Sequence, residues 1–138
     1  MAQKIVCASG YFSPFHIGHL EYLEKSKLLG TKLVVIVNSD KQSFIKKGSS
    51  FMNETERLRI IRSLKCVDFA ILSVDDDRTV CKTLRSVVPD IFTNGGDQTN
   101  DLIPEGDVCK ELGIQLVDSL GDKIQSSSWL ISKASIVN

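Results

Sequence analysis

Two histidines three residues apart, His16 and His19, are the side chains of this sequence best placed to do chemistry, and the chain contains no other histidine. They lie between an apolar run that ends at Ala8 and a helical pattern that begins at His19. Gly10 permits a tight turn and a close backbone approach. Gly18 leaves space beside the helix N-terminus, whose unpaired N–H groups and partial positive charge suit a phosphate. Because residues three apart share one side of a helical turn, the pattern predicts a phosphate site with two imidazole donors.

A zinc site is the main alternative for a His-x-x-His pair, but it needs a third ligand, which here would have to be Cys, Asp or Glu. The four cysteines contain no Cys-x-x-Cys pair, and they are Cys7, Cys66, Cys81 and Cys109. That spacing is poor for structural zinc and untypical of a small disulfide framework. We therefore expect reduced thiols and favour the phosphate interpretation.

The bulk composition indicates one globular domain spanning residues 1–138. Apolar residues make up 42% and charged residues 25%, so a core can form. Seventeen basic residues balance seventeen acidic ones. The chain therefore lacks the excess of positive charge that non-specific nucleic-acid binding needs. The sequence shows neither a signal-peptide layout nor an apolar run long enough for a membrane span. We expect a cytoplasmic protein without a nucleic-acid or membrane partner.

Short apolar runs alternate with helical patterns along the chain. The expected strands are Ile5–Ala8, Leu33–Val37, Phe69–Leu72, Ile91–Thr93 and Ile114–Val117. The expected helices are His19–Leu29, Thr55–Leu64, Thr79–Val87, Glu105–Leu112 and about Ser128–Ile136. This alternation predicts an α/β fold, a Rossmann-like, doubly wound, five-stranded parallel sheet of strand order 3-2-1-4-5. Ligands of such sheets bind at the carboxyl ends of the strands, where the order reverses. The polar stretch Lys41–Asn53, centred on Gly48, is expected to be a mobile loop.

The segment His16-Ile17-Gly18-His19 resembles the His-x-Gly-His motif of the cytidylyltransferase-like nucleotidyltransferases, such as glycerol-3-phosphate cytidylyltransferases and heptose-1-phosphate adenylyltransferases. Three further segments resemble the same family in the same order: Glu56–Asp68, Pro89–Asp97 and Ser126–Ser128. The resemblance covers nearly the whole chain. It implies attack by a phosphomonoester oxygen on the α-phosphorus of CTP or ATP, with pyrophosphate leaving.

The resemblance also implies roles for individual side chains. His16 and His19 are expected to donate to the α- and β-phosphates. Lys47, together with Lys46, is expected to close over the phosphates, with a solvated loop tip as the alternative. Arg57 is expected to contact pyrophosphate, with a structural ion pair as the alternative. Catalysis would then consist of positioning two polyanions and neutralising the charge that builds between them.

Further residues are predicted to bind the substrates. The nucleotide-binding set is Gly10, Tyr11, Phe12, Gly18, Lys46, Gly95, Asp97, Lys123, Ser126, Ser127 and Ser128, and the acceptor-binding set is Ser13 and Asp40. Asp97 would face the ribose or base unless it is a plain turn residue, and the three serines would also cap the last helix. Two positions depart from the family pattern, because Ser13 stands where Asp is usual and Lys123 where Arg is usual.

The choice of substrate stays open at this point. The Gly95-Gly96-Asp97 segment favours ATP, whereas chain length also matches the CTP-dependent enzymes. The acceptor is expected to be a small sugar phosphate or polyol phosphate, with Mg²⁺ bridging the triphosphate and a homodimer as the assembly. The alternatives are a non-catalytic nucleotide-binding regulatory module, supported by Ser13, and a flavodoxin-like protein, which would carry a flavin absorbance.

Overall fold

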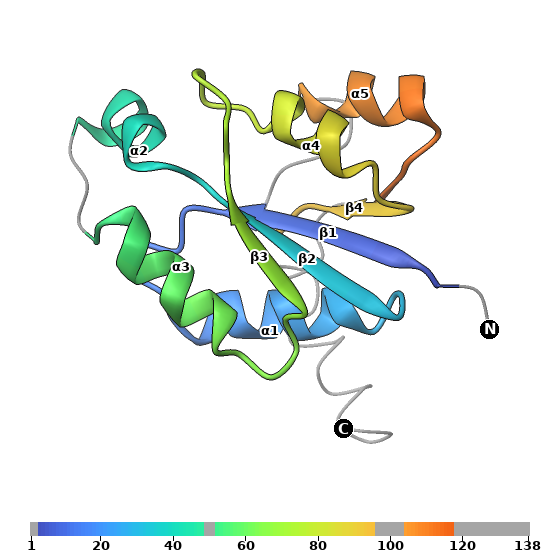
Figure 1. Cartoon of the computed structure of the whole chain (residues 1–138), viewed down its shortest axis with the longest axis horizontal. Coiled ribbons are helices and arrows are strands. Elements are labelled where there is room, and N and C mark those ends of the chain that lie inside the picture. Colours follow the sequence, from blue (N-terminus) through green and yellow to red (C-terminus); the bar gives the residue numbers. More distant parts are fainter. Residues whose placement is uncertain (1–2, 49–51, 96–103, 118–138) are drawn as a thin grey trace, which may run out of the picture.

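The computed structural model describes residues 3–48, 52–95 and 104–117, and Figure 1 shows their arrangement. Five strands form one parallel sheet in the order β3-β2-β1-β4-β5, which confirms the predicted fold class and strand order. The strands are β1 Ile5–Gly10, β2 Lys32–Val37, β3 Phe69–Leu72, β4 Ile91–Thr93 and β5 Gln115–Val117. The chain moves outward from β1 to β3 and then returns to the other side of β1 as β4. The order therefore reverses between β1 and β4, where a ligand crevice is expected.

Helices cover both faces of this sheet (Figure 1). They are α1 Ile17–Lys27, α2 Asp40–Lys47, α3 Glu54–Arg62, α4 Cys81–Val87 and α5 Glu105–Leu112. Helices α1 and α3 lie on one face, and α4 and α5 lie on the other. The last predicted helix, about Ser128–Ile136, lies outside the described residues. No helix among the described residues is both long and apolar enough to span a membrane.

The alternation of side chains along the central strand divides the core into two layers. Val6 and Ala8 of β1 pack with the α1–α3 layer, which includes Leu23. Cys7, between them, packs with the α4–α5 layer, which includes Leu84. Both faces of the strand are buried, and this explains why the strand reads as a continuous apolar run rather than as an alternating pattern.

Helix α2 differs from the prediction, because an irregular loop was expected over Lys41–Asn53. The Ser39 hydroxyl accepts from the Gln42 N–H at 3.2 Å, and Gln42 Oε1 accepts from the Ser39 N–H at 2.9 Å. This reciprocal cap starts the helix. Gly48, at φ 77°, ends it in the left-handed region that glycine tolerates best. The prediction of a loop is therefore wrong for residues 41–47, which belong to α2.

Candidate active site

The two histidines cap helix α1 reciprocally. The Gly18 N–H donates to His16 Nδ1 at 3.1 Å, and the His16 N–H donates to His19 Nδ1 at 3.2 Å. An Nδ1 atom that accepts a hydrogen bond carries no proton, so the neutral ring is protonated on Nε2. The capping geometry therefore fixes the tautomer of both rings and makes Nε2–H the donor that each of them presents.

Aromatic packing holds the imidazoles in place. The rings of His16 and His19 stack with centroids 3.9 Å apart, and His19 also stacks on Phe15 at 5.7 Å. The buried Phe12 ring meets His19 edge-on at 5.3 Å. His19 is thus seated against the core while His16 lies exposed on its outer side. This arrangement orients donors at a helix N-terminus, as a phosphate site requires.

Glycine at position 10 is required by the same packing. A Cβ atom on Gly10 would lie 2.8 Å from the Phe12 ring, which folds beneath it. Phe12 itself has φ 55°, in the left-handed region. A larger residue at Gly10 would displace the ring that supports His19. Gly10, Phe12 and Gly18 therefore shape the predicted phosphate loop, and Gly18 supplies one of its capping N–H groups.

Arg57 lies in a different environment from the one predicted for a pyrophosphate ligand. Its side chain is fully buried, and its guanidinium donates to protein acceptors from several segments. Nε donates to the Met52 carbonyl at 2.8 Å, and Nη1 donates to the carbonyls of Tyr11 at 2.9 Å and of Asn38. Nη2 donates to Asp40 Oδ1 at 2.9 Å. Arg57 therefore fits the alternative of a structural ion pair, joining the loops after β1 and β2 to the start of α3.

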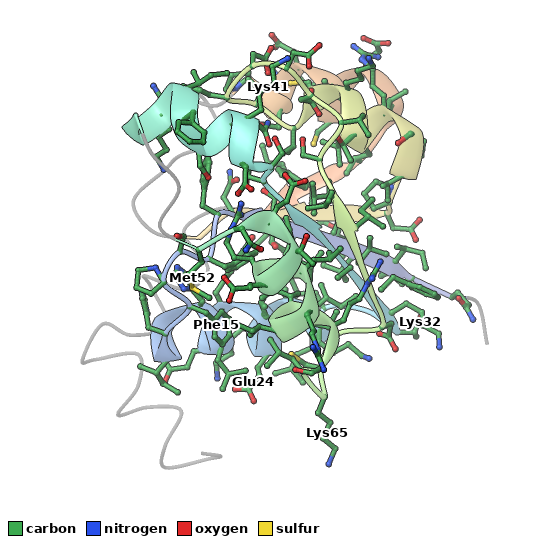
Figure 2. The ribbon with its side chains drawn as sticks, turned by 60° about the vertical axis from the view of Figure 1, so that its left-hand side comes forward. Phe15, Glu24, Lys32, Lys41, Met52 and Lys65 are labelled. Carbon is green, nitrogen blue, oxygen red and sulfur yellow. The ribbon has the colours of Figure 1, made fainter. Side chains whose placement is uncertain are left out.

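The two predicted acceptor residues are also tied into this framework. The Asp40 carboxylate pairs with Arg57, and the Asp40 N–H donates to Glu54 Oε1 at 2.8 Å. The Ser13 hydroxyl accepts from the Met52 N–H at 3.3 Å. Met52, labelled with Phe15 in Figure 2, thus links the phosphate loop to the start of α3. Ser13 and Asp40 lie near the site but bond to the protein itself.

Lys46 and Lys47 belong to helix α2 rather than to a loop. Lys46 Nζ lies 4.3 Å from the centroid of the Tyr11 ring, a cation–π distance. Tyr11 follows β1 directly, so this contact brings the charge of Lys46 next to the phosphate loop. Lys47 is the last residue of the same helix. The structure thus places the Lys46 charge at the site that the sequence predicted, on a different element.

Gln42 is a positioning residue that sequence reasoning missed. Its buried side chain accepts from Asn38 Nδ2 at 3.0 Å and donates to the carbonyls of Asp77 and Thr79 at 2.7 and 2.8 Å. These bonds join α2 to the loop that precedes α4. The Ser39-x-x-Gln42 spacing was the available signal, since Ser followed by Gln three residues later is a capping-box pattern.

The end of β4 forms the other wall of the crevice. The Tyr22 hydroxyl donates to the Thr93 carbonyl at 2.8 Å, and burial raises the pKa of Tyr22 to about 12. A Cβ on Gly95 would lie 3.2 Å from the Tyr22 ring, so glycine allows the close approach there. The remaining predicted site residues lie outside the described residues, and they are Asp97, Lys123, Ser126, Ser127 and Ser128. All four cysteines are free thiols, as expected.

Comparison with known proteins found a matching family model and several relatives. A family model described as "Cytidylyltransferase-like" matches residues 7–125. An FAD synthase from Thermoplasma acidophilum is 37% identical over 132 residues, covering 96% of this chain and 89% of that protein. A bifunctional protein HldE from Citrifermentans bemidjiense is 34% identical over 138 residues, covering 95% of this chain.

The relatives differ in length and one has a solved structure. The chain spans 27% of the length of that HldE protein, about a quarter. The crystal structure of a lipopolysaccharide core biosynthesis protein from Thermoplasma volcanium matches with a TM-score of 0.73 and 34% identity. That match covers 85% of this chain and 96% of the other. The likeness therefore extends over most of the length of two relatives and over about a quarter of a longer one.

Proposed function

Because this chain belongs to the cytidylyltransferase-like family, as its sequence motifs suggested, we propose that it transfers AMP or CMP to a small sugar-phosphate or polyol-phosphate acceptor. An acceptor phosphate oxygen forms a bond to the α-phosphorus of ATP or CTP. The bond from that phosphorus to the bridging oxygen breaks, and its electron pair leaves with pyrophosphate. The reciprocal histidine cap of α1 is the observation that carries this proposal, since it directs two fixed N–H donors to a helix N-terminus.

The residues of the chain supply binding and charge stabilisation rather than a strong base. A phosphomonoester is already an anion near neutral pH, so it needs no deprotonation to attack. The Nε2–H groups of His16 and His19 would donate to oxygens of the α- and β-phosphates as negative charge builds there. The partial positive charge at the N-terminus of α1 would add to the same field. Lys46 would bring positive charge from the other side of the loop.

Mg²⁺ is expected to accompany the triphosphate. Among residues 3–48, 52–95 and 104–117, no three His, Cys, Asp or Glu side chains gather as a metal site. Mg²⁺ usually keeps several waters and takes phosphate oxygens with one or two carboxylates, so it does not need such a cluster. Asp40, whose side chain is 32% exposed, is a carboxylate that this part of the site could offer to it. When bound, the ion would neutralise charge on the departing pyrophosphate.

ATP is the nucleotide that we favour, and a ribityl phosphate is the first acceptor to test. FAD consists of FMN joined to AMP through pyrophosphate, so a relative named FAD synthase makes an AMP-linked product. FMN is itself the phosphomonoester of a polyol chain. This chain matches the FAD synthase over most of that protein's length but matches only about a quarter of the HldE protein. The FAD synthase is therefore the better guide to the substrates of this chain.

Pyrophosphate release tests the proposal directly. The full chain would be incubated with Mg²⁺, ATP or CTP, and a panel of FMN, ribitol 5-phosphate, glycerol 3-phosphate and hexose 1-phosphates. We expect release that requires one nucleotide and one acceptor, with a matching product by mass spectrometry. Tight nucleotide binding without release for any acceptor would contradict catalysis and favour the regulatory module. Light scattering in the same buffer tests the expected homodimer.

A further inference from the structure

Two buried polar atoms at the sheet end have no hydrogen-bond partner among the described residues. They are Asn94 Nδ2 and Tyr11 Oη. Asn94 is 7% exposed, so its amide is shielded from water as well as unpaired. Native proteins pair nearly all of their buried polar groups, and each exception calls for an explanation. An orphaned donor in a ligand crevice is explained by a ligand that accepts from it.

The strand register brings the two residues to the same end of the sheet. Strands β1 and β4 are neighbours, with Cys7 opposite Phe92. Continuing that register places Ser9 opposite Asn94, and Tyr11 follows two residues later. Both residues therefore lie at the carboxyl ends of the two strands between which the strand order reverses. That is the position at which doubly wound sheets bind their ligands.

Both side chains lie on the α4–α5 side of the sheet. Thr93 Oγ1 lies 2.9 Å from Ser26 Oγ of α1, so Thr93 faces the α1 layer. Successive residues of a strand alternate, which puts Asn94 on the opposite face. Tyr11 lies on that face too, because its hydroxyl is close enough to Glu105, the first residue of α5, for that carboxylate to affect its pKa.

Two cations flank Tyr11 at the exposed rim. Lys46 Nζ lies 4.3 Å above the ring. Arg78 lies beside the hydroxyl, where its charge and a side-chain hydrogen-bonding interaction oppose the rise in the pKa of Tyr11 that burial causes, although that contact does not meet ordinary hydrogen-bond geometry. Gln42 holds the backbone around Arg78 by donating to the carbonyls of the residues on either side of it. The exposed rim, with Lys46 and Arg78, is therefore suited to a phosphate. The buried part, with Tyr11 Oη and Asn94 Nδ2, is suited to uncharged oxygen atoms of a ligand.

We propose, given the function proposed above, that Tyr11 and Asn94 recognise the hydroxyl groups of a polyol monophosphate acceptor. The acceptor phosphate would lie between Lys46 and Arg78, and Tyr11 Oη and Asn94 Nδ2 would bond to its hydroxyl oxygens. Uncharged buried groups suit neutral oxygens, whereas a phosphate dianion needs cations. The α1 histidines lie on the other face, so attack from this side is compatible with in-line displacement of pyrophosphate.

Calorimetry with a matched pair of ligands tests this proposal without requiring turnover. Ribitol 5-phosphate and n-pentyl phosphate carry the same phosphate, but only the first has hydroxyls. We expect the wild type to prefer ribitol 5-phosphate by at least about tenfold, since a site built around hydroxyl contacts rejects an analogue that lacks them. Asn94→Ala and Tyr11→Phe should each reduce that preference to about threefold or less. Both should bind α,β-methylene ATP within about twofold of the wild type, because this proposal assigns the Tyr11 hydroxyl to the acceptor rather than to the nucleotide that the sequence predicted for Tyr11.

The control is Asn38→Ala, which removes a buried asparagine that is already paired and should keep the preference. Equal preference in the wild type and in both variants would overturn the proposal. So would a loss confined to α,β-methylene ATP, or failure of the wild type to bind ribitol 5-phosphate. Tyr11→Phe removes a single oxygen, so it provides the answer if Asn94→Ala does not fold. Absence of pyrophosphate release from the wild type would instead contradict the proposed function, whatever the binding result.

Discussion

Two buried asparagines flank the central strand, and they differ in how completely the protein satisfies them. Asn38 directly follows β2 and Asn94 directly follows β4, with 4% and 7% exposure. Asn38 Nδ2 donates to Gln42 Oε1, and the backbone carbonyl of Asn38 accepts from Arg57. Asn94 Nδ2 has no partner among the described residues. Similar burial with unequal pairing is what we expect if one side chain holds the fold and the other is available to a ligand.

The same contrast extends to the regions around them. On the β2 side, Arg57 and Gln42 are buried and bond to protein acceptors from several loops. At the ends of β1 and β4, Tyr11 Oη and Asn94 Nδ2 have no hydrogen-bond partner within residues 3–48, 52–95 and 104–117, and Lys46 of α2 lies over the Tyr11 ring. The β2 side is thus a polar framework, and we expect the substrates to bind between the ends of β1 and β4. Mutations should separate the two by affecting stability on one side and ligand binding on the other.

Arg57→Met should have the largest effect of all, and it should be on stability. Removing the guanidinium leaves several buried carbonyls and the Asp40 carboxylate without their donor. We expect the free energy of unfolding to fall by about 3–5 kcal/mol, as for other broken buried charge pairs. Urea denaturation measures it. Arg59→Met, an exposed arginine on the same helix, is the control and should change stability by no more than about 0.5 kcal/mol.

A folded Arg57→Met protein with near-normal stability but lost pyrophosphate binding would restore the role first predicted for this residue. The sequence could show that an arginine lies at this point of a helix, but not which way it points. Burial decides its role, and burial follows from where the chain places the carbonyls of Tyr11, Asn38 and Met52. Those positions depend on three separate loops and leave no local pattern.

His16→Asn should have the next largest effect, on catalysis alone. Asparagine is among the best N-cap residues, so it should keep the start of α1 and hold stability within about 1 kcal/mol. It removes the imidazole donor, and loss of one charge-stabilising donor costs about two to three orders of magnitude in turnover. Measuring both pyrophosphate release and thermal stability separates a loss of turnover from a loss of stability. Near-normal turnover in this variant or in His19→Ala would contradict the proposed role of the pair.

The histidines also show what sequence could establish about the site. Their spacing, with Gly18 between them, predicted a phosphate site at a helix start, and the structure places both at that start. The reciprocal cap was not predicted, because histidine is not a usual capping residue. The sheet order followed from short apolar runs alternating with helical patterns, which allow few topologies. Helix α2 was missed because its polar composition concealed a cap that Ser39 and Gln42 already encoded.

The asparagine pair gives the direct test of the contrast between the two sides. Asn38→Ala breaks a buried hydrogen bond to Gln42, and we expect it to cost about 1–3 kcal/mol of stability. Asn94→Ala removes an amide nitrogen that has no partner among the described residues, so its cost should be smaller than that of Asn38→Ala. Chemical denaturation of the two variants side by side measures the difference. Equal destabilisation would mean that Asn94 is paired within the protein and that the contrast does not hold.

The smallest expected effect concerns Asp68, which directly precedes the edge strand β3. Its carboxylate accepts from the Leu33 N–H at 2.8 Å and from Lys27 Nζ at 2.7 Å. Burial disfavours the charged form, but these donors outweigh it and lower the pKa of Asp68 below its ordinary value of 3.8. A lowered native pKa adds stability above the unfolded pKa, and that stability is lost as pH falls through the native value.

Asp68→Asn should therefore lower stability by about 1 kcal/mol at pH 7, the upper end for a partly exposed pair, and the gap should close below about pH 4. Asp76→Asn is the control, because Asp76 is 78% exposed and its pair with Lys41 should contribute about 0–0.5 kcal/mol. Urea denaturation from pH 2.5 to 7 measures both. A gap that persists at the lowest pH would assign the effect to the Leu33 hydrogen bond alone. Both carboxylates already have partners within the protein, and Asp68 lies at the amino end of β3. Neither variant should therefore alter acceptor binding at the carboxyl ends of the strands.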